Sequence, residues 1–126
     1  MKIVYIAGSF THPTPEGICE NIRAAARIGH EVRKLGAGAV VPHLIGAPYV
    51  VGASIASHAD EFGYEWWIEE TKELLRRCDA LLLIDGWENS SGARGEWRDA
   101  VDRCMPVFTR LEDLARWLEE TKGDAA

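Results

Sequence analysis

The sequence predicts an α/β domain in which helices cover both faces of a parallel sheet. Short apolar segments alternate along the chain with longer segments whose apolar residues recur at helical spacing. The short segments are apolar throughout, as expected of strands that are buried on both faces. Right-handed crossovers between such strands favour a single doubly wound sheet.

The first half of the chain holds two predicted strands and one predicted helix. Apolar composition predicts strands over residues 3–7 and 39–41. Between them, helical spacing predicts a helix over residues 18–35, which glycines end. The stretch 10–17 contains two prolines and is predicted as a loop.

The second half continues the alternation after a long connection. Segment 44–62 is longer than an ordinary connection, which predicts either a functional role, such as a lid or a wall beside a ligand, or a short further element within it. The pattern that follows is helix, strand, helix, strand, helix, over residues 65–77, 80–84, 93–103, 106–108 and 111–118. We therefore expect about four strands in the flavodoxin-like order 2-1-3-4.

Size and composition indicate one domain over residues 1–122, with a frayed tail at 123–126. The chain has 126 residues and a formal net charge of −6, which argues against a DNA or RNA partner. No signal peptide or membrane-spanning stretch is recognised, so the prediction is a cytoplasmic protein without a membrane partner. The three cysteines form no CxxC pair, and the histidines have no metal-ligand spacing, so neither a metal nor another cofactor is expected.

The predicted strand order places the ligand site at the carboxyl ends of the strands, beside the switch point between the first and third strands. Four groups of residues follow strands at this edge. They are Gly8 and Ser9, His43, Asp85 and Trp87, and Ser90, Ser91 and Gly92.

The turn at Ser90–Gly92 links a buried strand to a helix, so its backbone N–H groups are suited to an anion. Glu96 is expected in the first helical turn after it, where a carboxylate can act as nucleophile or general base. The alternative is structural, because an acidic side chain in a first turn also stabilises the helix dipole.

Over residues 1–108 the chain resembles the nucleoside 2-deoxyribosyltransferase-like superfamily. The resemblance is carried by Ile3–Ser9, Pro42-His43, Cys78–Leu83, Gly86–Glu88, Ser91–Glu96 and Pro106-Val107. It implies an enzyme that acts on an N-glycosidic bond, in which Glu96 attacks the anomeric carbon and Tyr5 orients Glu96. Transfer of the sugar to water makes such an enzyme a hydrolase, and transfer to a second base makes it a 2-deoxyribosyltransferase.

The resemblance also implies a substrate, because Ser90–Gly92 is similar to the loop that holds the 5′-phosphate in the superfamily's nucleoside 5′-monophosphate N-glycosidases. Arg94 is a further phosphate candidate, since a guanidinium matches phosphate oxygens. Asp85 is a candidate for the ribose hydroxyls, Trp87 for stacking on the base, and His43 for base or sugar. Each also has a structural alternative: Ser9, Ser90, Ser91 and Gly92 as turn formers, and the others as surface, loop or core residues.

One position departs from the superfamily's pattern. Thr71 stands where those proteins usually have an Asp that acts on the base or as an acid. Glu69 or Glu70 could replace it if the helix is shifted, and Asp60 or Glu61 could do so from the long connection. A nucleotide-binding protein without turnover and a flavodoxin-like interaction domain are therefore the alternative functions. The surplus of aromatic residues, together with the resemblance, predicts a homodimer or a higher homo-oligomer.

Overall fold

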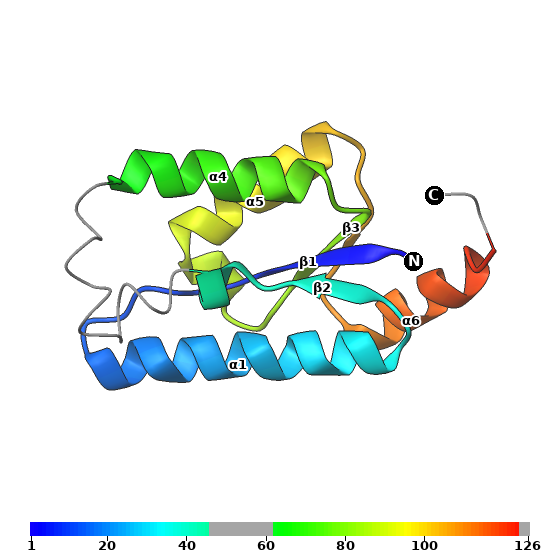
Figure 1. The fold of residues 1–126 in the computed structure, drawn as a ribbon, viewed down its shortest axis with the longest axis horizontal. Coiled ribbons are helices and arrows are strands. Elements are labelled where there is room, and N and C mark those ends of the chain that lie inside the picture. The colour runs from blue at the N-terminus through cyan, green and yellow to red at the C-terminus, as the bar shows by residue number, and fades with distance from the viewer. Residues whose placement is uncertain (46–61, 124–126) are drawn as a thin grey trace.

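The computed structural model describes residues 1–45 and 62–123 and confirms the predicted fold class (Figure 1). Four parallel strands form one sheet in the order β2-β1-β3-β4. Their bounds are Ile3–Ala7 for β1, Gly38–Val40 for β2, Ala80–Leu83 for β3 and Val107–Phe108 for β4. The expected order 2-1-3-4 is the observed one.

Helices cover both faces of this sheet, as expected (Figure 1). The bounds are Pro15–Lys34 for α1, Tyr64–Arg76 for α4, Ser91–Asp102 for α5 and Leu111–Glu120 for α6. No helix in the described ranges is long and apolar enough to span a membrane. Most of the long connection and the last three residues of the predicted tail lie outside the described residues, as do Asp60 and Glu61.

Alternation of side chains along the strands divides the core into two layers. Val4, Ile6 and Leu82 face α1 and α6, where they pack with Ala25, Val32 and Leu114. Tyr5, Ala7, Leu81 and Leu83 face the other way and pack with residues of α4 and α5: Leu75, Ala93 and Ala100. The α4/α5 layer therefore contains both Tyr5 and the helix that carries Glu96.

Two helices begin two or three residues earlier than the sequence predicted, and α4 begins one residue earlier. Helix α1 begins at Pro15, so the predicted loop over 10–17 ends at Thr14. The Thr14 side chain accepts a hydrogen bond of 3.1 Å from the Gly17 N–H. Proline is favoured at the first position of a helix, where its missing N–H costs nothing, so Pro15 starts the helix that it was expected to exclude.

Helix α5 begins at Ser91, two residues before the predicted start, because Ser90 is its N-cap. The Ser90 hydroxyl accepts from the Ala93 N–H at 3.2 Å, which is the usual role of a serine at this position. A short 3₁₀ helix over Trp87–Asn89, which the sequence did not predict, connects β3 to this cap.

Candidate functional site

The site is built around a hydrogen bond between a strand and a helix that are distant in the sequence. The Tyr5 hydroxyl of β1 donates to Oε2 of Glu96 on α5. Tyr5 is completely buried, and Glu96 is half-buried. The two residues that the sequence singled out as nucleophile and orienting group are therefore in direct contact.

Glu96 is the sixth residue of α5, because the helix begins at Ser91. The expectation that it lies in the first helical turn is wrong, and the first turn of α5 contains no acidic residue. The effect of the helix dipole on a side chain is confined to the terminal turn. Stabilisation of the helix dipole therefore does not account for the acidic side chain at this position.

Burial controls the protonation of this pair. Desolvation raises the pKa of Glu96 to about 7, and the hydrogen bond from Tyr5 acts in the opposite direction. Burial, followed by the Glu96 charge, raises the pKa of Tyr5 further above its already high ordinary value. At neutral pH the phenol therefore keeps its proton and donates it in the hydrogen bond, while the carboxylate changes its charge near pH 7.

Thr71 of α4 is the third member of the site, although the sequence marked it only as a departure. Its side chain acts on the Tyr5 phenol and lowers the phenol's pKa, against the larger effects of burial and Glu96. The same Thr71 Oγ1 is close to two backbone carbonyl oxygens, that of Trp67 at 2.9 Å and that of Ile68 at 3.2 Å. Threonines in helices often bond back to the preceding turn in this way, and the contact fixes the side-chain rotamer.

The residues that begin α5 have different roles. The Ser90 hydroxyl is used by the helix itself as a cap, whereas Ser91 and Gly92 occupy the first two helical positions. N–H groups at these positions have no partner within their own helix. Arg94 donates from Nη1 to the Glu88 carbonyl at 2.6 Å and so connects the helix to the preceding 3₁₀ turn.

Gly8 and Ser9, which follow β1, lie against residues that follow β3. A Cβ on Gly8 would collide with the Ile84 side chain, so only glycine fits here without movement. The Ser9 hydroxyl lies 3.4 Å from the Gly86 carbonyl. Gly86 has φ +88°, a conformation that favours glycine.

His43, after β2, is buried rather than open to the solvent. It is 4% exposed, and its Nε2 lies 3.0 Å from the Ser9 carbonyl, to which it donates in the neutral tautomer. Its ring contacts Phe10 edge-on, with centroids 5.8 Å apart. Burial lowers the pKa of His43, so the imidazole is neutral at pH 7. Its Nδ1 has no hydrogen-bond partner among the described residues.

Two further candidates, Asp85 and Trp87, lie on opposite sides of the sheet. Asp85 is exposed and lines a hollow of about 320 Å³ with Arg27 and Thr109, on the side of the sheet that α1 covers. Trp87 packs against the core of the α4/α5 layer, with its ring centroid 5.8 Å from that of Trp97.

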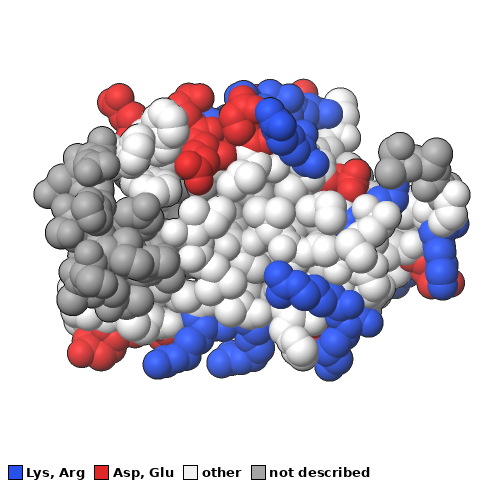
Figure 2. Space-filling model, viewed as in Figure 1, with Lys and Arg blue, Asp and Glu red and all other residues white. Residues whose placement is uncertain are grey.

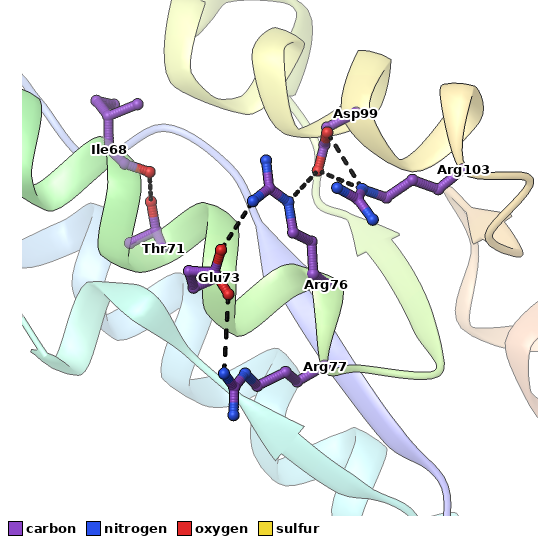
Figure 3. A network of polar contacts seen from close by, with 7 residues as sticks. All are labelled: Ile68, Thr71, Glu73, Arg76, Arg77, Asp99 and Arg103. Carbon is purple, nitrogen blue, oxygen red and sulfur yellow. Dashed lines mark hydrogen bonds and ion pairs between the residues drawn. The ribbon is translucent and has the colours of Figure 1, made fainter.

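Ion pairs connect the helix that carries Thr71 to the helix that carries Glu96 (Figure 3). Arg76 of α4 contacts Glu73 at 2.8 Å and lies 3.9 Å from Asp99 of α5. Asp99 also pairs with Arg103 at 3.3 Å. The network lies on the outside of the two helices and helps to hold them in register.

No group of three His, Cys, Asp or Glu residues within 1–45 and 62–123 could hold a metal ion. Cys19, Cys78 and Cys104 are free thiols. In Cys78, burial raises the pKa of the thiol to about 11, so it is not a reactive thiolate at neutral pH.

Comparison with protein families identifies one relationship. The chain belongs to the family described as Domain of unknown function (DUF4406), whose profile matches residues 2–109. This match includes Tyr5, Thr71 and Glu96 and ends before α6. The search of curated proteins found no match.

Proposed function

We propose that this protein cleaves, or transfers the sugar at, the N-glycosidic bond of a nucleoside 5′-monophosphate through a covalent ribosyl-Glu96 intermediate. The observation that carries the proposal is the contact between Tyr5 and Glu96. A half-buried carboxylate on a helix, held by a buried phenol on the central sheet, has the fixed orientation that a nucleophile needs.

The chemistry follows that of a retaining glycosidase. The ionised Glu96 oxygen attacks C1′ of the sugar as the bond to the base breaks, through a transition state with oxocarbenium character. Tyr5 donates a hydrogen bond to Oε2 of Glu96, and this bond keeps the carboxylate in place while the sugar moves onto it. Water, or a second base, then displaces the sugar from Glu96 and regenerates the carboxylate.

The start of α5 supports the choice of a phosphorylated substrate. Ser91 and Gly92 offer N–H groups at the positive end of the helix dipole, which favours a phosphate. Neither residue has a side chain that would block the approach of a large anion. Ser90 would contribute neither its hydroxyl, which caps the helix, nor its backbone N–H, which donates to the Trp87 carbonyl at 3.0 Å.

The homodimer stays a prediction that a single chain does not test. Trp66 and Trp97, 51% and 37% exposed, are large apolar side chains at the surface of α4 and α5. Light scattering of the purified protein would decide it: a mass of one chain contradicts the prediction.

The test of the function is base release from 5′-monophosphates and from the matching unphosphorylated nucleosides, followed by chromatography. We expect the wild type to release base from monophosphates and Glu96→Gln to be at least a hundredfold slower. Glu88→Gln is the matched control, because it removes an exposed carboxylate from the neighbouring turn and should leave the rate unchanged.

Each other outcome has a defined meaning. Saturable nucleotide binding without base release, unchanged in Glu96→Gln, contradicts the nucleophile and favours a binding protein. Neither binding nor release favours an interaction domain. Faster release from nucleosides than from monophosphates contradicts the phosphate site at Ser91 and Gly92.

A further inference from the structure

The hollow on the α1 side of the sheet has no part in the chemistry proposed for Glu96. It has a volume of about 320 Å³ and lies at the carboxyl ends of β3 and β4. Arg27 lines it from α1, Asp85 from the segment after β3, and Thr109 from the segment after β4. Tyr5 and the helix that carries Glu96 belong to the layer on the opposite side of the sheet. Because ligands of doubly wound sheets bind outside the carboxyl ends of the strands, this hollow is a second position suited to a small molecule.

The inner surface of the hollow is apolar. Ile28 of α1, Ile84 after β3 and Leu111 at the start of α6 line it, and all three are half-buried. The same three side chains pack against the core between the sheet and the α1 and α6 helices, which holds them in place. Their remaining surface is free to pack against an apolar group that enters the hollow. The apolar part of a ligand therefore has a fixed binding surface here.

Arg27 offers this hollow a positive charge that has no partner among the described residues. Figure 2 shows Lys and Arg side chains gathered along the edge of the molecule where α1 lies. The other Lys and Arg residues of α1 each contact a glutamate of the same helix or a backbone carbonyl: Arg23, Arg33 and Lys34. A guanidinium with free donors is suited to a carboxylate, which it can hold through two parallel hydrogen bonds.

Asp85 lines the same hollow with the opposite charge. Within residues 1–45 and 62–123 its carboxylate forms no ion pair, and Arg27 is not its partner. A ligand with a single charge would meet one of these two residues unfavourably, because Asp85 repels an anion and Arg27 repels a cation. An uncharged ligand would displace water from both charges without replacing it. The pair of unneutralised charges therefore favours a ligand that carries both a negative and a positive group.

We propose that this hollow binds a free amino acid with an apolar side chain. The carboxylate of the ligand pairs with Arg27, its ammonium group pairs with Asp85, and its side chain packs on the apolar inner surface. The Thr109 hydroxyl is a further hydrogen-bond partner for the carboxylate. Arg27 and Asp85 are both exposed, so the two ion pairs keep part of their hydration and avoid the cost of burying charges. The proposal goes beyond the reaction at Glu96 and does not depend on it.

Isothermal titration calorimetry with matched compounds tests the site. The set is L-phenylalanine, 3-phenylpropanoate, which lacks the ammonium group, and 2-phenylethylamine, which lacks the carboxylate. We expect saturable binding of L-phenylalanine with a Kd of about 0.1–1 mM, as for a small ligand on a partly open surface. Each analogue should bind about tenfold more weakly, because it leaves one charge of the hollow unpaired. Glycine, which has both charges and no apolar side chain, should also bind about tenfold more weakly.

Two variants assign the charges to their partners. Arg27→Gln should weaken the binding of L-phenylalanine and of 3-phenylpropanoate about tenfold and should not weaken that of 2-phenylethylamine. Asp85→Asn should weaken the binding of L-phenylalanine and of 2-phenylethylamine and should not weaken that of 3-phenylpropanoate. Arg23→Gln and Glu88→Gln are the matched controls, because each removes a nearby exposed charge that does not line the hollow. Neither control should change any of the three affinities.

Ala24→Phe tests the position of the ligand, because Ala24 lines the hollow from α1 and the larger side chain would fill it. Binding of L-phenylalanine should be lost. If this variant does not fold, Arg27→Gln and its control still decide the position.

Three results would overturn the inference. Unchanged affinity for L-phenylalanine in Arg27→Gln or in folded Ala24→Phe places the ligand elsewhere. An analogue that binds as tightly as L-phenylalanine overturns the class of ligand. Saturable binding of neither L-phenylalanine nor L-leucine overturns the site itself. None of these measurements involves base release, so their failure is distinguishable from failure of the proposed function.

Discussion

Arg76 on α4 and Asp99 on α5 lie 3.9 Å apart, and theirs is the ion pair that crosses between the two helices supplying Thr71 and Glu96. Asp99 is 20% exposed and also pairs with Arg103, so it is the shared member of the network. Asp99 therefore connects an ion pair with α4 to the helix that carries Glu96.

Replacing the shared carboxylate should weaken the docking of the two helices. We expect Asp99→Asn to lower the free energy of unfolding by about 0.5–1 kcal/mol, the upper range for partly exposed ion pairs. Glu20→Gln, which breaks the exposed pair with Arg23 on α1, is the control and should have a smaller effect. Urea unfolding of both variants measures this; equal losses would mean that the network adds nothing beyond an ordinary surface pair.

Glu96 should make stability fall as the pH rises. Its folded pKa of about 7 lies above the ordinary value of 4.5, so the folded state holds a proton that the unfolded state releases. The resulting stabilisation is complete below pH 4.5 and is lost as the pH rises to about 7. Between pH 4.5 and 8 the free energy of unfolding of Glu96→Gln should therefore rise by up to about 3 kcal/mol relative to that of the wild type. A difference that does not change with pH would contradict the burial of the charge.

Removing the phenol of Tyr5 should impair the ionisation of Glu96. The hydrogen bond from Tyr5 lowers the pKa of this carboxylate, so Tyr5→Phe should move the rising limb of kcat/KM to higher pH. At pH 7 we expect a loss of tenfold or more, on the order of the effect of one oriented donor in an active site. Much of the activity should return at pH 9, whereas a purely structural defect would leave the variant equally slow at both values.

His43 should contribute to stability only while it is neutral. Burial lowers its folded pKa below the ordinary 6.5, so its contribution is present above pH 6.5 and is lost as the pH falls through the folded pKa. His43→Phe leaves the Ser9 carbonyl without its donor and should cost about 1–2 kcal/mol at pH 7.5. This cost should shrink at pH 5. Unfolding curves at the two values test it, and a cost that grows on acidification would contradict it.

A methyl group at Gly8 should be tolerated only if Ile84 gives way. Gly8→Ala should destabilise the protein by about 1–3 kcal/mol, because the new Cβ overlaps the Ile84 side chain. In the double variant Gly8→Ala, Ile84→Ala the two losses should be less than additive. Full additivity in a double-mutant cycle would show that the two positions do not interact.

The sequence was sufficient to predict the sheet, because buried parallel strands are apolar in an unbroken run. Ile3–Ala7 was predicted with its observed bounds, and Ala80–Ile84 was one residue too long. The predicted helix starts were less accurate. Proline and serine are common in turns, but here Pro15 is the first residue of α1 and Ser90 is the N-cap of α5. The 3₁₀ turn at Trp87–Asn89 has no periodicity to detect.

The site was predicted in part. Tyr5 and Glu96 were chosen together on a resemblance, and they are in contact. The influence of Thr71 on the pKa of Tyr5 was missed because it depends on how α4 packs against the sheet, which no local pattern records. Asp85 directly follows the predicted third strand, but residues near a strand end can face either layer, and this one lines a hollow on the α1 side.

The position of Glu96 along α5 has a consequence for substrate length. In an α-helix each residue advances about 1.5 Å, so four residues separate Gly92 from Glu96 by roughly 6 Å along the axis. Under the proposed function, with the phosphate at the first turn and C1′ at Glu96, this spacing would select for substrate length. A sugar with one phosphate on its 5′ carbon would fit, whereas the extra group of a diphosphate would carry the anomeric carbon past the carboxylate.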